Sequence, residues 1–167
     1  MPPLMFSIEE TEAVVLALAL LERTGDEDLK HAAKRAAGKI AGSVPAPLRR
    51  VIGRNALHAW GDIAPSPTGI TPGLVRRAIH DEQKIKIAYR DELGRTTERT
   101  IRPLALIYYS ATMVIVAWCE LRLALRNFRA DRVDSSALAD GFFRGEGDRL
   151  RKQWMAGWTS SDGGASN

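Results

Sequence analysis

The stretch KIKIAYRDELGRTTERTIRPLALIYY, Lys84 to Tyr109, decides the fold. Its first residues alternate Ile85, Ile87 and Tyr89 with polar or small side chains, which is the period of a strand with one buried face. The glycine-containing turn DELGR follows, and the chain returns as TTERTIRPLALIYY, so the two runs predict an antiparallel hairpin. Pro103 cannot donate a hydrogen bond to a neighbouring strand, and we expect it to mark an edge or a bend between two strands.

Further strand and helix signals flank this hairpin. Downstream, ATMVIVAWC (111–119) is a nearly unbroken apolar run and LALRNFRADRV (123–133) reads as a final strand. Upstream, Thr71 can cap a helix that begins at Pro72 and ends near Gln83. One helix and about five short strands with tight turns predict a small closed antiparallel β-barrel, because closure removes unpaired strand edges.

The N-terminal part predicts helices. The sequence SIEE, starting at Ser7, is a capping box that opens a helix, and a second helix begins with the acids of DEDLK. A short third helix is expected in PAPLRRVIGRN (45–55), and the Pro- and Gly-rich GDIAPSPTGITPG reads as a linker. We therefore expect a helical segment over residues 1–60, a linker over 61–73, a β-domain over 74–143, a C-terminal helix over 144–158 and a disordered tail over 159–167.

The composition is that of a soluble globular protein. Of the 167 residues, 45% are hydrophobic and 26% are charged. The longest apolar run, Ala13 to Leu21, is too short to span a bilayer, and no basic segment of a signal peptide precedes it. The single cysteine, Cys119, rules out an internal disulfide and fits the cytoplasm, where we expect it to be a buried thiol.

The sequence contains no pattern typical of a catalytic or metal site. Its three histidines show no metal-ligand spacing, and no phosphate-binding loop or nucleophile elbow is present. We therefore expect no enzymatic activity, no cofactor and no metal. The net charge of +4 belongs entirely to residues 70–167, because residues 1–69 carry equal numbers of acidic and basic side chains. An anionic partner is therefore to be sought in the second part of the chain.

Residues 74–143 resemble a known family. The motif R-x-F-R-x-D-R-V in RNFRADRV, the apolar strand with AWCELR, the segment RTIRPLAL and the trailing FF are similar to the WYL domain, the sensor module of many bacterial transcriptional regulators. The Trp-Tyr-Leu triplet that names the family falls at Met113–Ile115, which reads MVI here. The resemblance implies an α+β fold with an Sm-like, SH3-type β-barrel. It also implies the binding of a phosphate-bearing effector or a short nucleic acid.

The resemblance also implies what the chain lacks. Such regulators usually begin with a winged helix-turn-helix domain, and this sequence shows none, so we expect the part that reads operator DNA to be missing, either in a fragment or in a truncated member. The chain is then the effector-sensing and dimerising part of a regulator, and we expect a homodimer. The alternative is a stand-alone barrel that binds single-stranded nucleic acid.

The candidate site residues are mainly arginines, since guanidinium groups bind phosphate bidentately. On a continuous strand, Arg126 and Arg132 would share a face with Phe128, while Arg129 and Asp131 would share the other. We expect Asp131 to form a structural ion pair with a neighbouring arginine, and Arg122 to be solvent-exposed. In the alternative, the arginines are solvated on the outside of the barrel and the aromatic residues fill its core. The expected anion-binding residues are Arg126, Arg129, Arg132, Arg102, Tyr108 and Phe128.

Overall fold

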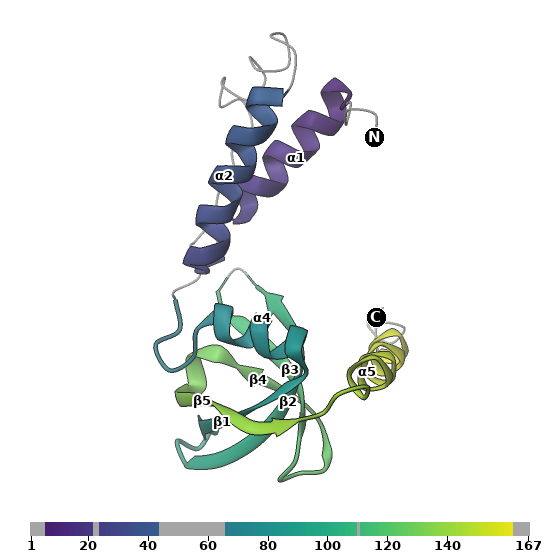
Figure 1. Cartoon of the computed structure of the whole chain (residues 1–167). Coiled ribbons are helices and arrows are strands. Elements are labelled where there is room, and N and C mark those ends of the chain that lie inside the picture. The colour runs from purple at the N-terminus through teal and green to yellow at the C-terminus, as the bar shows by residue number, and fades with distance from the viewer. Residues whose placement is uncertain (1–5, 22–23, 44–65, 110, 162–167) are drawn as a thin grey trace, which may run out of the picture. The chain divides into compact units, whose positions relative to one another are not determined.

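The computed structural model describes residues 6–21, 24–43, 66–109 and 111–161, and the chain divides into two compact units, Met1–Pro65 and Ser66–Asn167 (Figure 1). In the first unit, helix α1 (Ile8–Leu21) packs against helix α2 (Glu27–Ser43). The capping box is confirmed: Glu10 Oε2 accepts from the Ser7 N–H at 2.8 Å, and Ser7 Oγ accepts from the Glu10 N–H at 3.2 Å. The predicted third helix, residues 61–65 of the predicted linker and the end of the predicted tail lie outside the described residues.

The second unit is built on a five-stranded antiparallel sheet with the order β4-β3-β2-β1-β5. A single-turn 3-10 helix, η1 (Ala130–Arg132), joins β4 to β5. Helices α4 and α5 flank the sheet in sequence, so the predicted α+β class and the number of strands are confirmed. The strand bounds are Gln83–Arg90 for β1, Thr96–Tyr108 for β2, Met113–Cys119 for β3, Ala124–Arg129 for β4 and Val133–Phe142 for β5.

The sheet is strongly curled but not closed, which corrects the prediction of a closed barrel. Strands β4 and β5 lie at opposite edges of the sheet, yet the three residues of η1 connect them, so the sheet must curl until these strand ends approach each other. No ladder joins β4 to β5 in the described part of the chain. The curl is bridged by side chains instead: the Tyr89 ring of β1 packs edge-to-face on Phe128 of β4, with 5.1 Å between centroids.

Three further predictions about the strands are wrong in detail. The run LALRNFRADRV is not one strand, because η1 interrupts it after Arg129. Strand β5 lies beyond the predicted final strand; its sequence is mostly polar or small, and only Val133 and Ala139 of it are buried. Pro103 does not split the returning strand. A β-bulge between Pro103 and Ala105 absorbs the proline, and β2 continues through it.

Helix α4 (Pro72–Asp81) begins as expected, with Thr71 Oγ1 accepting from the Leu74 N–H at 3.3 Å. It lies against β1, β2 and β5 and buries Val75 and Ala78 in the main core. The inner face of the sheet supplies most of the other core residues, among them Ile85, Ile87, Ile101 and Ile115. Helix α4 thus covers the apolar part of the curled sheet.

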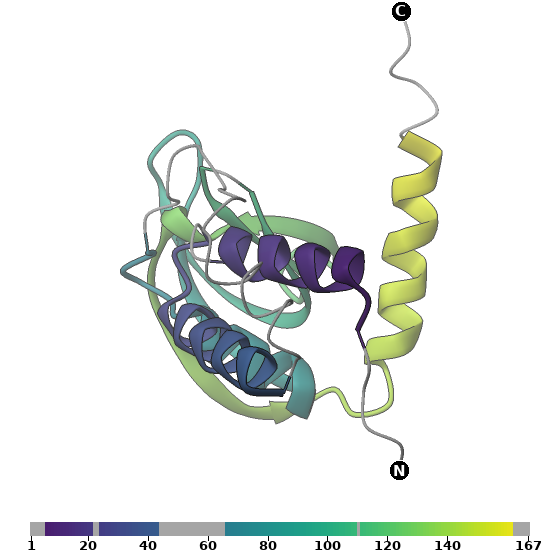
Figure 2. The same ribbon diagram turned by 90° about the horizontal axis from the view of Figure 1, so that it is seen from above.

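Helix α5 (Gly147–Ser161) extends beside the sheet, as Figure 2 shows. Its Leu150 packs with Leu104 and Phe143 in a second small core, against which Trp118 and Leu125 are partly buried. The helix runs past the predicted end at residue 158. Among the described residues, no helix is both long and apolar enough to cross a membrane.

Candidate anion-binding site

Two arginines extend from the inner face of the curled sheet. Cross-strand partners in an antiparallel pair share a face, and Arg99 of β2 is paired with Ile87 of β1, which is 2% exposed in the core. In β4, Arg126 lies two residues before the buried Phe128 and therefore points to the same side. Both residues thus stand at inner-face positions of the sheet, Arg99 half-buried and Arg126 exposed.

These arginines line a cleft of about 280 Å³. One wall comes from β1 and β2, through Tyr89 and Arg99. The other comes from β4 and the turn before it, through Arg122, Arg126 and Phe128. The two walls are far apart in sequence, and the curl of the sheet brings them together.

Arg99 is held in place by neighbours that carry no charge. Its guanidinium carbon lies 5.6 Å from the centroid of the Tyr89 ring and 5.9 Å from that of Phe128, within cation–π range. Its Nε donates to Thr97 Oγ1 at 3.1 Å. Because Thr97 engages Nε, the two terminal nitrogens remain available for a bidentate anion.

Positively charged side chains outnumber negatively charged ones in the lining of the cleft. Within the residues that the structure describes, no carboxylate lies within salt-bridge distance of Arg99, Arg122 or Arg126. Asp91 also lines the cleft, but it is engaged in the β1–β2 turn, where Oδ1 accepts from the Arg95 N–H and Oδ2 from Arg95 Nε, both at 2.9 Å. These hydrogen bonds, led by the one from the backbone of Arg95, lower the pKa of Asp91 below its ordinary value. The charged groups that line the cleft are therefore three arginines and one carboxylate, and that carboxylate is paired with Arg95.

Of the predicted site residues, only Arg126 and Phe128 line this cleft. Arg129 points away from it and forms a two-bond ion pair with Asp131, with Nε–Oδ1 at 3.1 Å and Nη2–Oδ2 at 2.9 Å. Thr112 Oγ1 also donates to Asp131 Oδ1, at 3.0 Å. These hydrogen bonds, chiefly the one from Arg129, hold the pKa of Asp131 below its usual range.

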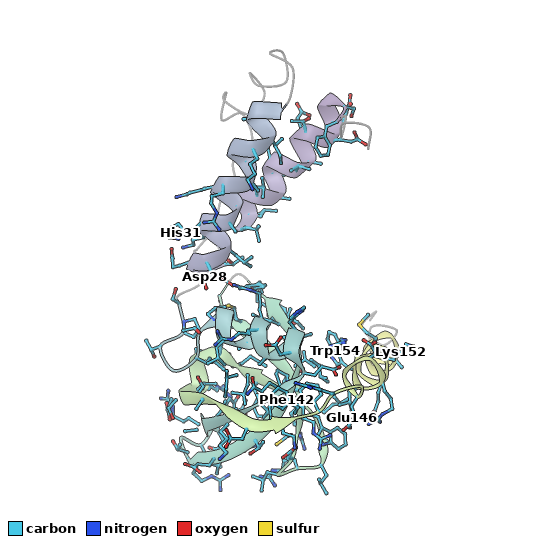
Figure 3. The ribbon with its side chains drawn as sticks, in the orientation of Figure 1. Asp28, His31, Phe142, Glu146, Lys152 and Trp154 are labelled. Atoms are coloured by element: carbon cyan, nitrogen blue, oxygen red, sulfur yellow. The ribbon has the colours of Figure 1, made fainter. Side chains whose placement is uncertain are left out.

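Arg132 and Arg102 also contact carboxylates. Arg132 lies in η1, beyond the end of β4, and its Nη1 is 3.3 Å from Glu92. Arg102 donates to Glu120 at 3.0 Å and to Glu146 at 2.8 Å. Glu146, labelled in Figure 3, immediately precedes α5, so Arg102 ties this helix to the sheet.

Two ionisable groups around this network have shifted pKa values. Burial alone would raise the pKa of Glu120, but hydrogen bonds from Lys84 and Arg102 lower it below the ordinary value. Tyr108 accepts a hydrogen bond from Arg76 of α4 at 3.1 Å, and burial raises the pKa of its phenol in spite of that cation. Tyr108 therefore ties α4 to the end of β2.

The residues that sequence reasoning missed are Arg99, Arg122 and Tyr89. Arg122 is exposed, as expected, but it also lines the cleft. Tyr89 was expected in the core, and it is both 8% exposed and part of the cleft wall. The signal that could have identified Arg99 is its place in TTERTIRP, two residues before the inward-facing Ile101. The strand register had to be known before that signal could be used.

Part of the sequence matches the model of a known domain family. Residues 72–138 match the model of the WYL domain. Among solved structures, the proteasome accessory factor B/C (PafBC) of Arthrobacter aurescens matches with 23% sequence identity and a TM-score of 0.42 over 87% of this chain. The match covers 22% of PafBC, so this chain spans about a fifth of that protein. The region from α4 into β5, which carries the arginine cleft, is a WYL domain.

Proposed function

We propose that this chain is the effector-sensing part of a transcriptional regulator of the cytoplasm, and that the arginine cleft binds the phosphate group of the effector. The observation that carries the proposal is the pair of inward-facing arginines, Arg99 and Arg126, which no carboxylate neutralises within the described residues. Arg122 adds a third guanidinium at the rim. No catalytic step is part of the proposal.

The dimensions of the cleft favour a small phosphate-bearing ligand. A volume of about 280 Å³ lies just below the usual range for ligand pockets, which begins at about 300 Å³. A barrel that tracks single-stranded nucleic acid would instead need aromatic faces open to successive bases. Tyr89 and Phe128 are 8% and 2% exposed, so their rings form a wall rather than an open platform. For this reason we place the stand-alone single-strand binder second.

The other expected arginines have a secondary part in this proposal. Arg129 follows Phe128 directly, but it would have to leave Asp131 before it could contact a ligand. Arg132 and Arg102 would likewise have to leave their carboxylates. We therefore assign the primary contacts to Arg99 and Arg126, and assign Arg102, Arg132 and Tyr108 to the support of the domain.

The test is titration of the full chain with pyrophosphate and with a 5′-phosphorylated single-stranded tetranucleotide. Arg99→Ala and Arg126→Ala should each weaken binding about ten- to a hundredfold, because a hydrogen bond to a charged group contributes about 1.5–3 kcal/mol. Lys at either position should restore binding in part, since an ammonium lacks the guanidinium fork.

The matched control is Arg77→Ala, an exposed arginine of α4 that changes the net charge equally. Thermal melts recorded on the same samples separate loss of the site from loss of the fold. Equal affinity of all three alanine variants and the wild type would make the cleft arginines ordinary surface residues, and the proposal would then be wrong.

A further inference from the structure

The lead-in segment, Ser66–Thr71, is seated directly on the start of β5. Gly69 approaches the backbone carbonyl of Val133 so closely that a β-carbon at position 69 would overlap that oxygen. Ser136 Oγ donates to the Gly69 carbonyl at 2.8 Å. Ser136 is paired with Ile87 and therefore faces the inner side of the sheet, whereas its neighbour Ser135 is paired with Ala88 and faces outward. This seat is thus a backbone-to-backbone contact fixed by one hydroxyl group.

The same start of β5 supports the wall of the arginine cleft. Val133 is the ladder partner of Tyr89, whose ring contacts both Phe128 and the Arg99 guanidinium. Ile70 of the lead-in segment is 2% exposed and belongs to the same core cluster as these residues. Val133 and Tyr89 therefore connect the lead-in segment to the cleft.

The connection between β4 and β5 is short and packed. Between Phe128, in the cleft wall, and Val133, at the seat, lie Arg129 and the three residues of η1. Ala130 is buried, and its carbonyl accepts the N–H of Val133. The Arg129 N–H also points at the Tyr89 hydroxyl, at 3.4 Å. Because a packed core transmits displacement instead of absorbing it, a shift of Phe128 or Tyr89 must move Val133.

We propose that occupation of the arginine cleft and seating of the lead-in segment are thermodynamically coupled through Tyr89 and Val133. An anion that draws Arg99 and Arg126 together stabilises the cleft wall, and the wall in turn stabilises the seat of Gly69. The lead-in segment continues toward the N-terminal helices in sequence, so it reports the state of the cleft to the preceding part of the chain. This inference rests on the proposed anion binding and adds its regulatory consequence.

The coupling can be measured in both directions, because linkage is reciprocal. Hydrogen exchange of peptides that cover residues 66–74 should slow when the full chain is saturated with pyrophosphate. Conversely, Ser136→Ala should weaken pyrophosphate binding about two- to tenfold, the effect of one lost hydrogen bond, although Ser136 does not line the cleft. Gly69→Ala, which leaves no room for the seat, should weaken it further. Ser135→Ala, on the outer face, should bind as the wild type does.

The outcomes separate the two proposals. If Arg126→Ala loses pyrophosphate while Ser136→Ala and Gly69→Ala bind normally and exchange over 66–74 is unchanged by ligand, the cleft binds anions but the coupling is wrong. If the wild type shows no saturable binding of pyrophosphate, both the cleft assignment and the coupling are overturned. Ser136→Ala removes a single oxygen atom and should stay folded, with a melting temperature lowered by no more than a few degrees, so the test does not depend on whether Gly69→Ala folds.

Discussion

Arg126 and Arg129 lie three residues apart in the same strand, and their surroundings differ in kind. Arg126 shares the inner face with Phe128 and lines a cleft without a neutralising carboxylate, whereas Arg129 faces outward and is paired with Asp131. The parity of a strand predicts this division within β4. It fails for Arg132, because η1 breaks the alternation before that residue. Strand alternation in the sequence therefore predicts the direction of the side chains only as far as Arg129, where β4 ends.

The Arg129–Asp131 pair gives a pH-dependent prediction. The pKa of Asp131 is lowered in the folded protein, so the pair stabilises the fold above the unfolded value of about 3.9 and loses this effect as pH falls through the folded value. Asp131→Asn should therefore reduce the melting temperature at pH 7 by no more than a few degrees, because both side chains are nearly half exposed.

The difference in melting temperature should shrink as the pH is lowered from about 5 toward the folded pKa. Asp140→Asn, an exposed carboxyl group of β5, is the control and should show a smaller effect at every pH. A difference between wild type and Asp131→Asn that stays constant down to pH 2 would mean that the ion pair does not contribute to stability.

At the scale of elements, the hairpin and the helix before it were predictable, and the closing strand was not. Strands β1 and β3 and helix α4 bury regularly spaced apolar residues, which is the signal that sequence patterns detect. Strand β5 shows no such spacing, because most of its length is exposed and its place is set by the ladder with β1. The bulge at Pro103 also depends on the pairing of β2 with β3. Only the register of that pair shows that β2 continues past the proline.

The attachment of α5 gives a prediction at this scale. Glu82, at the end of α4, accepts hydrogen bonds through its carboxylate from the N–H groups of Gly145 and Gly147, the latter at 3.0 Å. These donors precede or begin α5 and would otherwise lack an intrahelical partner. A carboxylate also stabilises a helix N-terminus electrostatically. Glu82→Ala should therefore destabilise the docking of α5 by about 1–3 kcal/mol.

Hydrogen exchange provides the measurement. In Glu82→Ala, peptides from residues 145–157 should exchange about five- to a hundredfold faster, while peptides from β1 and β3 should keep their protection. Asp81→Ala, which removes the adjacent exposed carboxylate, should leave both regions unchanged. If α5 exchanges equally in the two variants, the Leu150 contacts alone hold the helix, and Glu82 has no part in its docking.

At the scale of the whole molecule, the sequence predicted the α+β class and the WYL resemblance but not the open seam of the sheet. Closure is the general way to remove strand edges, and that rule gave the wrong result here because η1 turns the chain before β4 and β5 can pair. The cleft depends on this geometry, since its two walls meet only through the curl. The spacing of the cleft arginines in the sequence therefore does not reveal that they lie in one site.

The N-terminal unit gives the last prediction, a homodimer. Ala13, Ala17 and Leu20 are exposed residues of α1 at helical spacing, and Leu20 exposes 51% of its surface. An apolar stripe on a helix is stabilised by packing against another apolar surface, and a second copy of the same helix supplies one in a symmetric dimer. Sedimentation velocity of the full chain should therefore show concentration-dependent dimerisation. Leu20→Glu should weaken it about tenfold or more, because burial of a leucine contributes about 1.5–3 kcal/mol. Gly38→Glu adds the same charge to an open position of α2 and is the control. A wild-type chain that remains monomeric at high micromolar concentration, or equal dimerisation of the two variants, would show that the α1 stripe is not a dimer interface.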